Sequence, residues 1–166
     1  MTLEDIPIGT PVFLDANIFV YHFAGKSESC SGLLEKVEQK KLQGITSSHT
    51  FAEVIHRLMI LEATQREFIS SGSPSQKLRK HRKQIGNLEI FHHQGKQLLA
   101  LPLEIVPITP SILREGISTA LQYHLLTNDA LIVAAMKERN ISALASADAD
   151  FIGIPGVTLY QPNDLK

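Results

Sequence analysis

Four carboxylates stand where a folded chain could bring them together, and together they suggest a metal-dependent chemistry. Asp15 directly follows a short apolar run, and the other three are Glu53, Asp129 and Asp148. Carboxylates that converge repel one another strongly unless a cation lies between them. An all-oxygen set without cysteine suits Mg²⁺ or Mn²⁺, and such an ion can polarise a phosphodiester and help to deprotonate an attacking water.

Each of these acids also has a structural interpretation. Glu53 has the spacing of a capping box with Thr50. Asp129 follows an asparagine that could cap a helix, and Asp148 lies in a sequence typical of a turn. Asp15 is harder to explain, because an acid directly after three large apolar residues is desolvated and needs a partner. The metal hypothesis requires that the four converge and that none is locked against an arginine.

Short apolar runs alternate with longer amphipathic stretches along the chain. The runs predict strands at 12–14, 45–47, 103–108, 143–146 and 157–160. The stretches predict helices at 16–23, 29–42, 50–67, 88–101, 110–123 and 129–139, with Gly44 just past the end of the second. This alternation is typical of an α/β domain with a parallel sheet, and ligands of such sheets bind beyond the carboxyl ends of the strands.

Length and composition fit one globular domain. The chain has 166 residues, 43% hydrophobic and 20% charged, which excludes a disordered tail or a fibrous repeat. The formal net charge is −1, so a nucleic-acid partner would have to be held by a local patch. Cys30 is the only cysteine, which excludes an intramolecular disulfide. No apolar run approaches the roughly 18 residues of a membrane span. The acidic start, Met1–Asp5, is unlike a secretory signal, so we expect a cytoplasmic protein.

One segment departs from this even charge balance. Residues 70–75 read as a loop, and residues 76–84 contain five cations and no acid. The cations are Lys77, Arg79, Lys80, Arg82 and Lys83. One interpretation is a solvated helix face or a loop, and the other is a grip on the phosphate backbone of RNA. The histidines at 49, 56, 92 and 93 are interpreted as ordinary surface or packing residues.

Four short motifs, taken in order, resemble those of the PIN-domain nucleases. They are Phe13-Leu14-Asp15-Ala16-Asn17, Ser48-x-x-x-x-Glu53-Val54, Asn128-Asp129-Ala130-Leu131-Ile132-Val133-Ala134-Ala135 and Ser146-Ala147-Asp148-Ala149-Asp150-Phe151. The segment Ile154-Pro155-Gly156-Val157 is similar to the one that usually leads to the family's last strand. Each motif is weak alone, but their order and spacing make the resemblance strong, and it covers most of the chain. The sequence resembles in particular the VapC-like toxins of toxin–antitoxin pairs.

The resemblance implies a fold and an activity. The fold would be a single three-layer α/β/α domain over residues 1–166, with a central parallel sheet of four to five strands and a basic insertion or extended loop around 70–87. The activity would be that of a Mg²⁺- or Mn²⁺-dependent endoribonuclease with the acidic site Asp15, Glu53, Asp129 and Asp148. Its products would carry 5′-phosphate and 3′-hydroxyl ends.

The resemblance also implies a role for each site residue. The direct metal ligands would be Asp15, Asp129 and Asp148. Glu53 would hold or activate a metal-bound water, and Asn17 and Ser146 would orient carboxylates or waters. Asp150 is either an auxiliary acid or a cap of the turn before Phe151, and the cap is the interpretation that we favour.

The implied partners are an RNA substrate, a small antitoxin whose tail crosses the active-site groove, and a second copy of the chain. The apolar faces of the early helices could serve the dimer or a partner helix. The alternatives are a PIN nuclease of RNA processing without an antitoxin, and an inactive nucleic-acid-binding module. A haloacid-dehalogenase-type phosphatase is disfavoured, because Asn17 stands where that chemistry needs a second aspartate.

Overall fold

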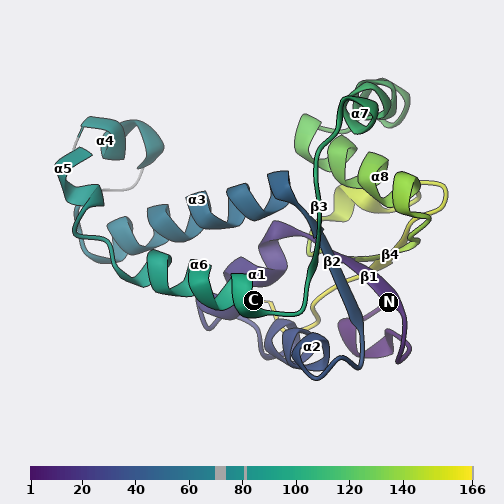
Figure 1. The fold of residues 1–166 in the computed structure, drawn as a ribbon, viewed down its shortest axis with the longest axis horizontal. Helices are drawn as coiled ribbons and strands as arrows, with labels where there is room; N and C mark the ends of the chain where they lie inside the picture. The colour runs from purple at the N-terminus through teal and green to yellow at the C-terminus, as the bar shows by residue number, and fades with distance from the viewer. Residues whose placement is uncertain (70–73, 81, 166) are drawn as a thin grey trace.

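Five parallel strands form one sheet at the centre of the molecule, which we describe from a computed structural model covering residues 1–69, 74–80 and 82–165. The strands are β1 (Pro11–Leu14), β2 (Gln43–Ser47), β3 (Glu104–Val106), β4 (Ala143–Ala145) and β5 (Thr158–Tyr160). Their order is β3-β2-β1-β4-β5 (Figure 1). The predicted parallel sheet is therefore confirmed, and β1 occupies its middle.

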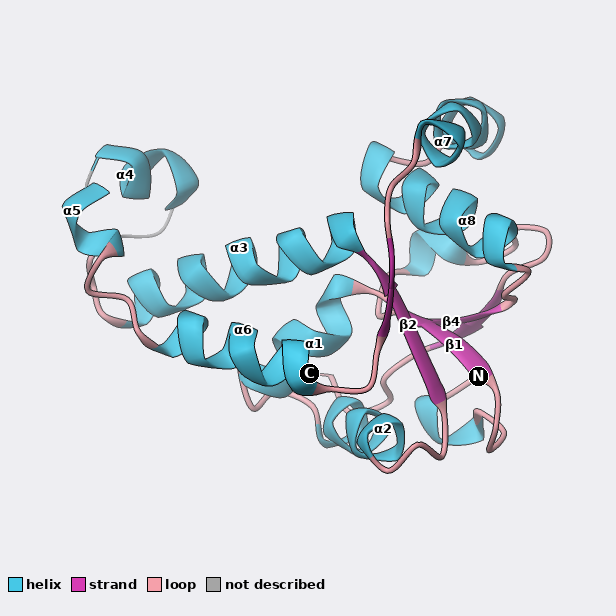
Figure 2. Ribbon diagram, viewed as in Figure 1, coloured by secondary structure: helices cyan, strands magenta, loops and turns pink. Residues whose placement is uncertain are grey.

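Helices cover both faces of the sheet (Figure 2), which gives the predicted α/β/α layers. One core contains residues of α1 (Ala16–Phe23), α2 (Glu28–Glu38), α3 (Ser48–Gln65) and α6 (Ile90–Ala100). The other contains residues of α7 (Pro110–Tyr123) and α8 (Thr127–Arg139). Successive side chains of a strand point to opposite faces. Val12 and Leu14 of β1 accordingly join the first core and Phe13 joins the second, all three fully buried.

Several predicted helix boundaries differ from the structure by one or two residues, and the end of the second helix differs by four, which explains a glycine. The second helix is predicted to reach residue 42, but α2 ends at Glu38, and Lys40 has a φ of +57°. Gly44, expected just past that helix, lies inside β2. A Cβ at Gly44 would stand 2.6 Å from Cγ1 of Val37, so the glycine allows α2 to pack closely on β2. The helices predicted at 16–23 and 110–123 match α1 and α7.

The helices α3 and α6 extend away from the sheet side by side (Figure 1). At their far end lie α4 (Pro74–Lys80) and α5 (Arg82–Ile85). A small separate core of Ala63, Ile69, Leu78 and Leu88 holds this end together. Part of the predicted loop over 70–75 lies outside the described residues, which omit 70–73. From residue 74 onward the basic stretch is helical wherever the structure describes it.

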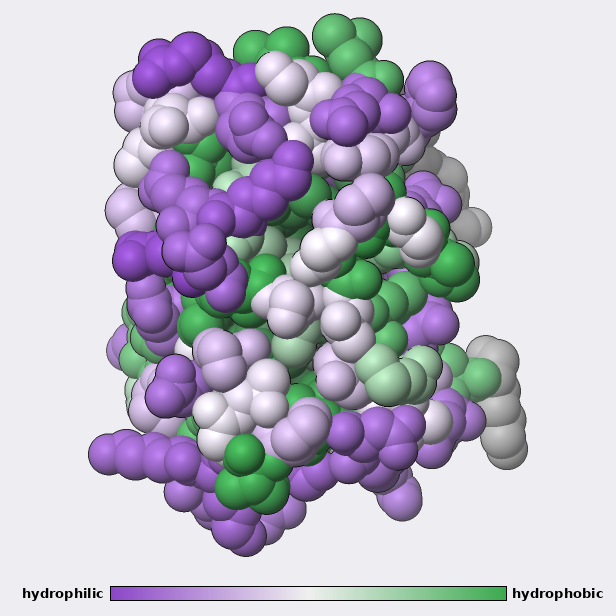
Figure 3. Space-filling view, turned by 90° about the vertical axis from the view of Figure 1, so that its right-hand side faces the viewer, coloured by the Kyte–Doolittle hydropathy of each residue, from purple (hydrophilic) through white to green (hydrophobic). Residues whose placement is uncertain are grey.

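One helix keeps an apolar row on its outer side. Leu113, Ile117 and Leu121 of α7 follow one another at every fourth residue and are 46%, 67% and 77% exposed. Hydrophobic side chains gather along the top of the face drawn in Figure 3, where α7 lies. The early helices, whose apolar faces we expected could serve a dimer or a partner helix, bury residues such as Leu33 and Leu34 in the core. Among the described residues, no helix is long and apolar enough to cross a membrane.

Candidate metal centre

Asp15 lies at the carboxyl end of β1, where it begins α1. Its side chain is 8% exposed and caps the helix by accepting the backbone N–H of Ala16. Its other oxygen accepts from Asn17 Nδ2 and, at 2.6 Å, from the hydroxyl of Ser146. Burial raises the pKa of Asp15, although the bonds from Ser146 and Ala16 act in the opposite direction. The sequence indicated that the buried Asp15 needs a partner, and its partners are neutral hydrogen-bond donors.

Asn17 and Ser146 join the end of β1 to the turn after β4. Nδ2 of Asn17 donates to Ser146 Oγ at 3.0 Å, and Oδ1 of Asn17 accepts from the backbone N–H of Ala147 at 3.0 Å. Ser146 Oγ also accepts the backbone N–H of Asp148 at 3.0 Å. Asn17 and Ser146 thus fix both Asp15 and the backbone that carries Asp148.

Three further aspartates gather beside this end of the sheet. Asp129, in the first turn of α8, and Asp148 and Asp150, after β4, each offer a carboxylate oxygen, and these oxygens lie within 4.8 Å of one another. Burial raises the pKa of Asp129 to about 6, together with the negative charges of Asp148, Asp15, Asp150 and Glu53. These acids therefore lie near enough to Asp129 to oppose its ionisation.

Asp148 also performs the capping role that we favoured for Asp150. Its Oδ1 accepts the backbone N–H of Asp150 at 2.9 Å and thereby begins the short 3₁₀ helix η2 (Ala149–Phe151). The interpretation of Asp150 as the cap is therefore wrong. Asp150 is exposed and adds its carboxylate to the group around Asp129.

The structural interpretations of Glu53 and of the asparagine before Asp129 are also wrong. The N-cap of α3 is Ser47, whose Oγ accepts the N–H of Thr50 at 3.0 Å, so Glu53 lies in the second turn and not in a capping box. The N-cap of α8 is Leu126, which makes no side-chain capping bond. Asn128 lies inside the first turn of α8, and its side chain reaches across to α3.

Glu53 has two partners on opposite sides. Oε2 accepts from Asn128 Nδ2 at 3.0 Å, and Oε1 lies 3.5 Å from Nη1 of Arg57, one turn farther along α3. The ion pair is long, and the side chains of Arg57 and Glu53 are 40% and 29% exposed. Exposed pairs of this kind contribute about 0.3–0.5 kcal/mol, so Arg57 does not lock Glu53. Oδ1 of Asn128 also lies 2.8 Å from Nε2 of His49.

The carboxylates around Asp129 fit a hard divalent cation. They supply oxygen atoms only, they come from the end of β1, from α3, from α8 and from the turn after β4, and together they oppose the ionisation of Asp129. A cation among them would relieve that repulsion. Mg²⁺ and Mn²⁺ prefer carboxylate oxygens and retain coordinated waters, so this arrangement could activate water beside a bound phosphate.

The basic residues are not part of this group. Lys77, Arg79 and Lys80 lie on α4, and Arg82 and Lys83 on α5, at the far end of α3 from the acids (Figure 1). Glu53 lies in the second turn of α3, and α4 begins beside the middle of the same helix, where Ser75 Oγ lies 3.1 Å from Nε2 of His56. Arg79, Lys80, Arg82 and Lys83 are exposed.

Sequence reasoning did not anticipate the contact with Asn128 that is made by His49, which we interpreted as a surface or packing residue. It lies four residues before Glu53, and residues with this spacing share one face of a helix. That spacing was the available signal, because it directs an imidazole and a carboxylate to the same side of α3. The contact with Asn128 had no local signal, since the two residues lie 79 positions apart.

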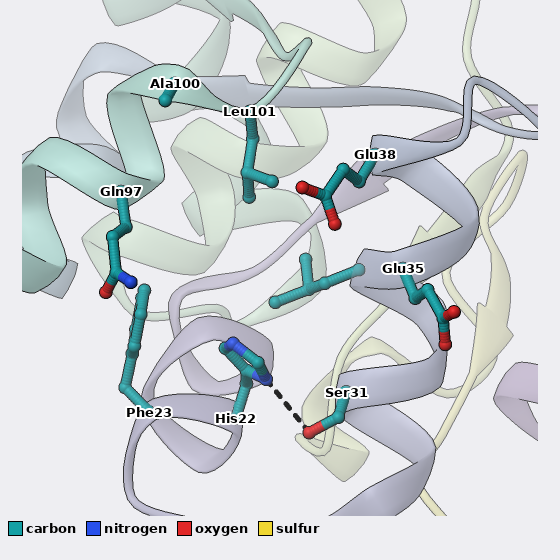
Figure 4. A pocket seen from close by; sticks show the side chains of 9 residues that line it. His22, Phe23, Ser31, Glu35, Glu38, Gln97, Ala100 and Leu101 are labelled. Carbon is teal, nitrogen blue, oxygen red and sulfur yellow. Dashed lines mark hydrogen bonds between the residues drawn. The ribbon is translucent and has the colours of Figure 1, made fainter.

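A pocket of about 490 Å³ lies between α1, α2 and α6, separate from the acidic group (Figure 4). Its lining includes His22, Phe23, Glu35, Glu38 and Leu101. Burial lowers the pKa of His22. None of the residues lining this pocket is a lysine or an arginine, so its formal charges are negative.

Comparison with known proteins gives consistent results. The family model "PIN domain" matches residues 12–157. A curated relative, Ribonuclease VapC2 of Methanocaldococcus jannaschii, is 31% identical over 144 residues, covering 84% of this chain and 86% of the relative. The structure resembles VapBC2 of Rickettsia felis bound to a promoter DNA fragment, with a TM-score of 0.60, 19% identity, and coverage of 93% and 100% of the two chains.

A second solved structure is VapC20 of Mycobacterium tuberculosis, described as a toxin that cleaves the sarcin–ricin loop. Its TM-score is 0.57 and its sequence is 13% identical, with coverage of 84% of this chain and 92% of the other. At these identities, the two structural matches bear on the fold alone.

Proposed function

Because this chain belongs to the PIN-domain family, we propose that it is a metal-dependent endoribonuclease and the toxin of a toxin–antitoxin pair. The observation that carries the proposal is the convergence of acids around Asp129, three of which bring carboxylate oxygens within 4.8 Å of one another. The name of the curated relative, a ribonuclease, supports RNA as the substrate class.

Asp15, Asp129 and Asp148 would hold Mg²⁺ or Mn²⁺, with Asp150 as an auxiliary acid at the exposed edge of the group. When bound, the ion would supply Lewis-acid polarisation of the scissile phosphate and would make water a stronger nucleophile. Asn17 and Ser146 would keep Asp15 in place with neutral hydrogen bonds, which leave its negative charge for the cation.

Glu53 would accept the proton of the attacking water. Its Oε2 is held by a single amide donor and its Oε1 by a long ion pair, so the carboxylate keeps acceptor capacity. Attack in line with the leaving 3′-oxygen would break the bond between phosphorus and that oxygen. The products would then carry 5′-phosphate and 3′-hydroxyl ends.

The exposed cations of α4 and α5 would hold the RNA backbone some distance from the cut. The acids and these cations lie along the same helix, α3, so an RNA strand or stem could contact both groups. Phosphate contacts would give affinity here and no sequence selection.

Two surfaces would serve protein partners. The pocket between α1, α2 and α6 combines apolar walls with Glu35 and Glu38, which suits an antitoxin segment bearing apolar and basic side chains. The row Leu113, Ile117 and Leu121 on α7 would pair with the same row of a second copy about a two-fold axis. A short neighbouring gene with a DNA-binding pattern would favour the toxin role over an RNA-processing nuclease. Either role would be exercised in the cytoplasm.

The test of the proposed reaction is a cleavage assay on total RNA with Mg²⁺, with Mn²⁺ and with EDTA, in which the product ends are mapped. We expect cleavage with either ion, none with EDTA, and 5′-phosphate ends at every new terminus. Full activity in EDTA after exhaustive dialysis would contradict the proposal.

A further inference from the structure

Glu53 stands between two partners that would draw it in different directions. Arg57 belongs to the same helix and lies 3.5 Å from Oε1, so it draws the carboxylate along the surface of α3. Asn128 belongs to α8, directly before Asp129, and its Nδ2 donates to Oε2 at 3.0 Å. Only the second contact ties Glu53 to the helix that carries another acid of the group. The position of Glu53 therefore depends on the orientation of one amide.

That amide has a single orientation that satisfies all its neighbours. The group facing the Glu53 carboxylate must be the NH₂ of Asn128, because a carbonyl oxygen there would repel it. The carbonyl Oδ1 then faces Nε2 of His49 at 2.8 Å. Since Oδ1 can only accept, Nε2 of His49 must carry a hydrogen, and His49 donates. His49 thus prevents the amide of Asn128 from turning away.

We propose that His49 is a positioning residue, which acts through Asn128 to hold Glu53 toward the acidic group. The inference rests on the proposed reaction and gives a role in it to two residues, His49 and Asn128, to which the sequence analysis gave none. His49 touches neither the acids nor, in this proposal, the RNA. It fixes a donor on α8, and that donor holds Glu53 in competition with Arg57. Its loss should slow the chemical step and leave substrate binding unchanged.

The experiment compares four variants, each assayed for kcat and KM on one defined RNA in saturating Mg²⁺. His49→Leu removes the donor, His49→Gln keeps an N–H that can reach Oδ1, and Asn128→Ala removes the amide. His93→Leu is the matched control, because His93 is an exposed imidazole on α6, away from these contacts. Circular dichroism and thermal melting show which variants fold, and the glutamine variant keeps the test usable if the leucine variant does not.

We expect His49→Leu and Asn128→Ala to lower kcat on the order of tenfold with KM unchanged, which corresponds to the loss of one hydrogen bond to a charged group. His49→Gln should retain most of the activity and His93→Leu all of it. Combining His49→Leu with Asn128→Ala should cost no more than either change alone, because both break the same connection. Adding Arg57→Gln to Asn128→Ala should restore part of kcat, since the competing cation is then absent.

Other results overturn the inference. An unchanged kcat in His49→Leu shows that Glu53 does not depend on this contact. A raised KM with kcat unchanged shows that His49 binds RNA directly. An equal loss in His49→Gln and His49→Leu shows that the imidazole does something that an amide N–H cannot. The proposed reaction is tested separately, with Asp15→Asn and with EDTA. If these abolish cleavage while His49→Leu is fully active, only the positioning role of His49 is wrong.

Discussion

The helix α3 borders two buried carboxylates, one near each end, and only one of them is compensated by a cation. Near its far end, Glu62 is 2% exposed and accepts the backbone N–H of Glu89 at 3.0 Å and of Phe91 at 2.9 Å, while Arg66 lies 2.9 Å away. Near its start, Asp15 is 8% exposed and also caps a helix, but it faces neutral donors and other acids.

The pKa directions of the two acids express this difference. Burial alone would raise the pKa of Glu62, but the backbone donors at the start of α6 and the charge of Arg66 outweigh it and lower the pKa. Burial also raises the pKa of Asp15, and there the donors do not outweigh it. A buried acid with a matched cation fastens two elements together. A buried acid whose neighbours are also acidic needs something from outside the chain, which makes it a candidate for function.

The largest expected effect is on activity at the uncompensated end. Asp15→Asn keeps the shape of the side chain and removes the charge that would bind the cation. We expect a loss of at least about a hundredfold in kcat, since even residues behind the metal ligands cost 10–100-fold. The metal-free protein should stay folded but lose some stability, because the new amide nitrogen cannot accept the hydrogen bonds that one oxygen of Asp15 receives. Cleavage rates and urea unfolding measure the two quantities, and a wild-type rate in saturating Mg²⁺ would refute the site.

The compensated end should behave in the opposite way. Glu62→Gln leaves Arg66 without its partner and weakens the cap of α6, so we expect a loss of about 2 kcal/mol in the free energy of unfolding. This lies below the range for fully buried pairs because the Arg66 side chain is 35% exposed. The kcat per folded molecule should not change. If Glu62→Gln instead lost much of its activity and kept wild-type stability, the two ends of α3 would not differ in the way that we describe.

Divalent ions should act on one end only. At a concentration of 100 times Kd, Mg²⁺ or Mn²⁺ should stabilise the wild-type protein by about 2.7 kcal/mol. The ion should stabilise Glu62→Gln by the same amount and Asp15→Asn by much less. Thermal melts with and without the ion compare the three proteins, and an equal gain in Asp15→Asn would mean that the ion binds elsewhere.

The two ends should also differ in the pH dependence of stability. Asp129 titrates at about 6 in the fold and near its ordinary 3.8 when unfolded, so the folded protein binds more protons between those values. The stability of the metal-free protein should therefore fall as pH rises from about 4 to 6, by on the order of 1 kcal/mol after allowance for partial exposure. Glu62, with a lowered pKa, contributes stability above 4.5 that is lost as pH falls.

Urea unfolding from pH 4 to 7 separates these two contributions. Asp129→Asn should abolish the fall in stability above pH 4, and Glu62→Gln should leave that fall unchanged. If Asp129→Asn shows the same fall as the wild type, the proton is taken up by a different group.

The smallest expected effect is on RNA affinity at the far end. Changing Lys80, Arg82 and Lys83 to Gln removes three exposed cations. The slope of log affinity against log salt should flatten by about 2, at roughly 0.7 for each phosphate contact of a single strand. The maximal cleavage rate should be unchanged. An unaltered slope would show that these cations do not contact phosphate.

The sequence was informative wherever a residue's position follows from connectivity. Parallel strands place their carboxyl ends at one edge of the sheet, so Asp15 and Asp148 could be expected to meet before any coordinates were known. The end of α2 was mispredicted because apolar periodicity continues to Leu42, while the packing of Val37 on Gly44 requires an earlier turn into β2.

The finer contacts of the site could not be predicted. The sequence suggested Thr50 and Asn128 as the N-caps of the helices that carry Glu53 and Asp129. The N-caps are Ser47 and Leu126 instead. The bond between His49 and Asn128 depends on how α3 lies against α8, which no local pattern encodes. The sequence shows that Arg66 lies four residues after Glu62 on the same helix, but it does not show that Glu62 is buried.

The central place of β1 in the sheet has a consequence for how this scaffold can change. The chain leaves β1 toward β2 on one side and reaches β4 on the other, and the acidic group lies where these two connections diverge. The place of the group in the fold therefore follows from the order of the strands. Insertions at the marginal strands β3 and β5, or replacement of the α4–α5 tip, should therefore be tolerated without moving the acidic group.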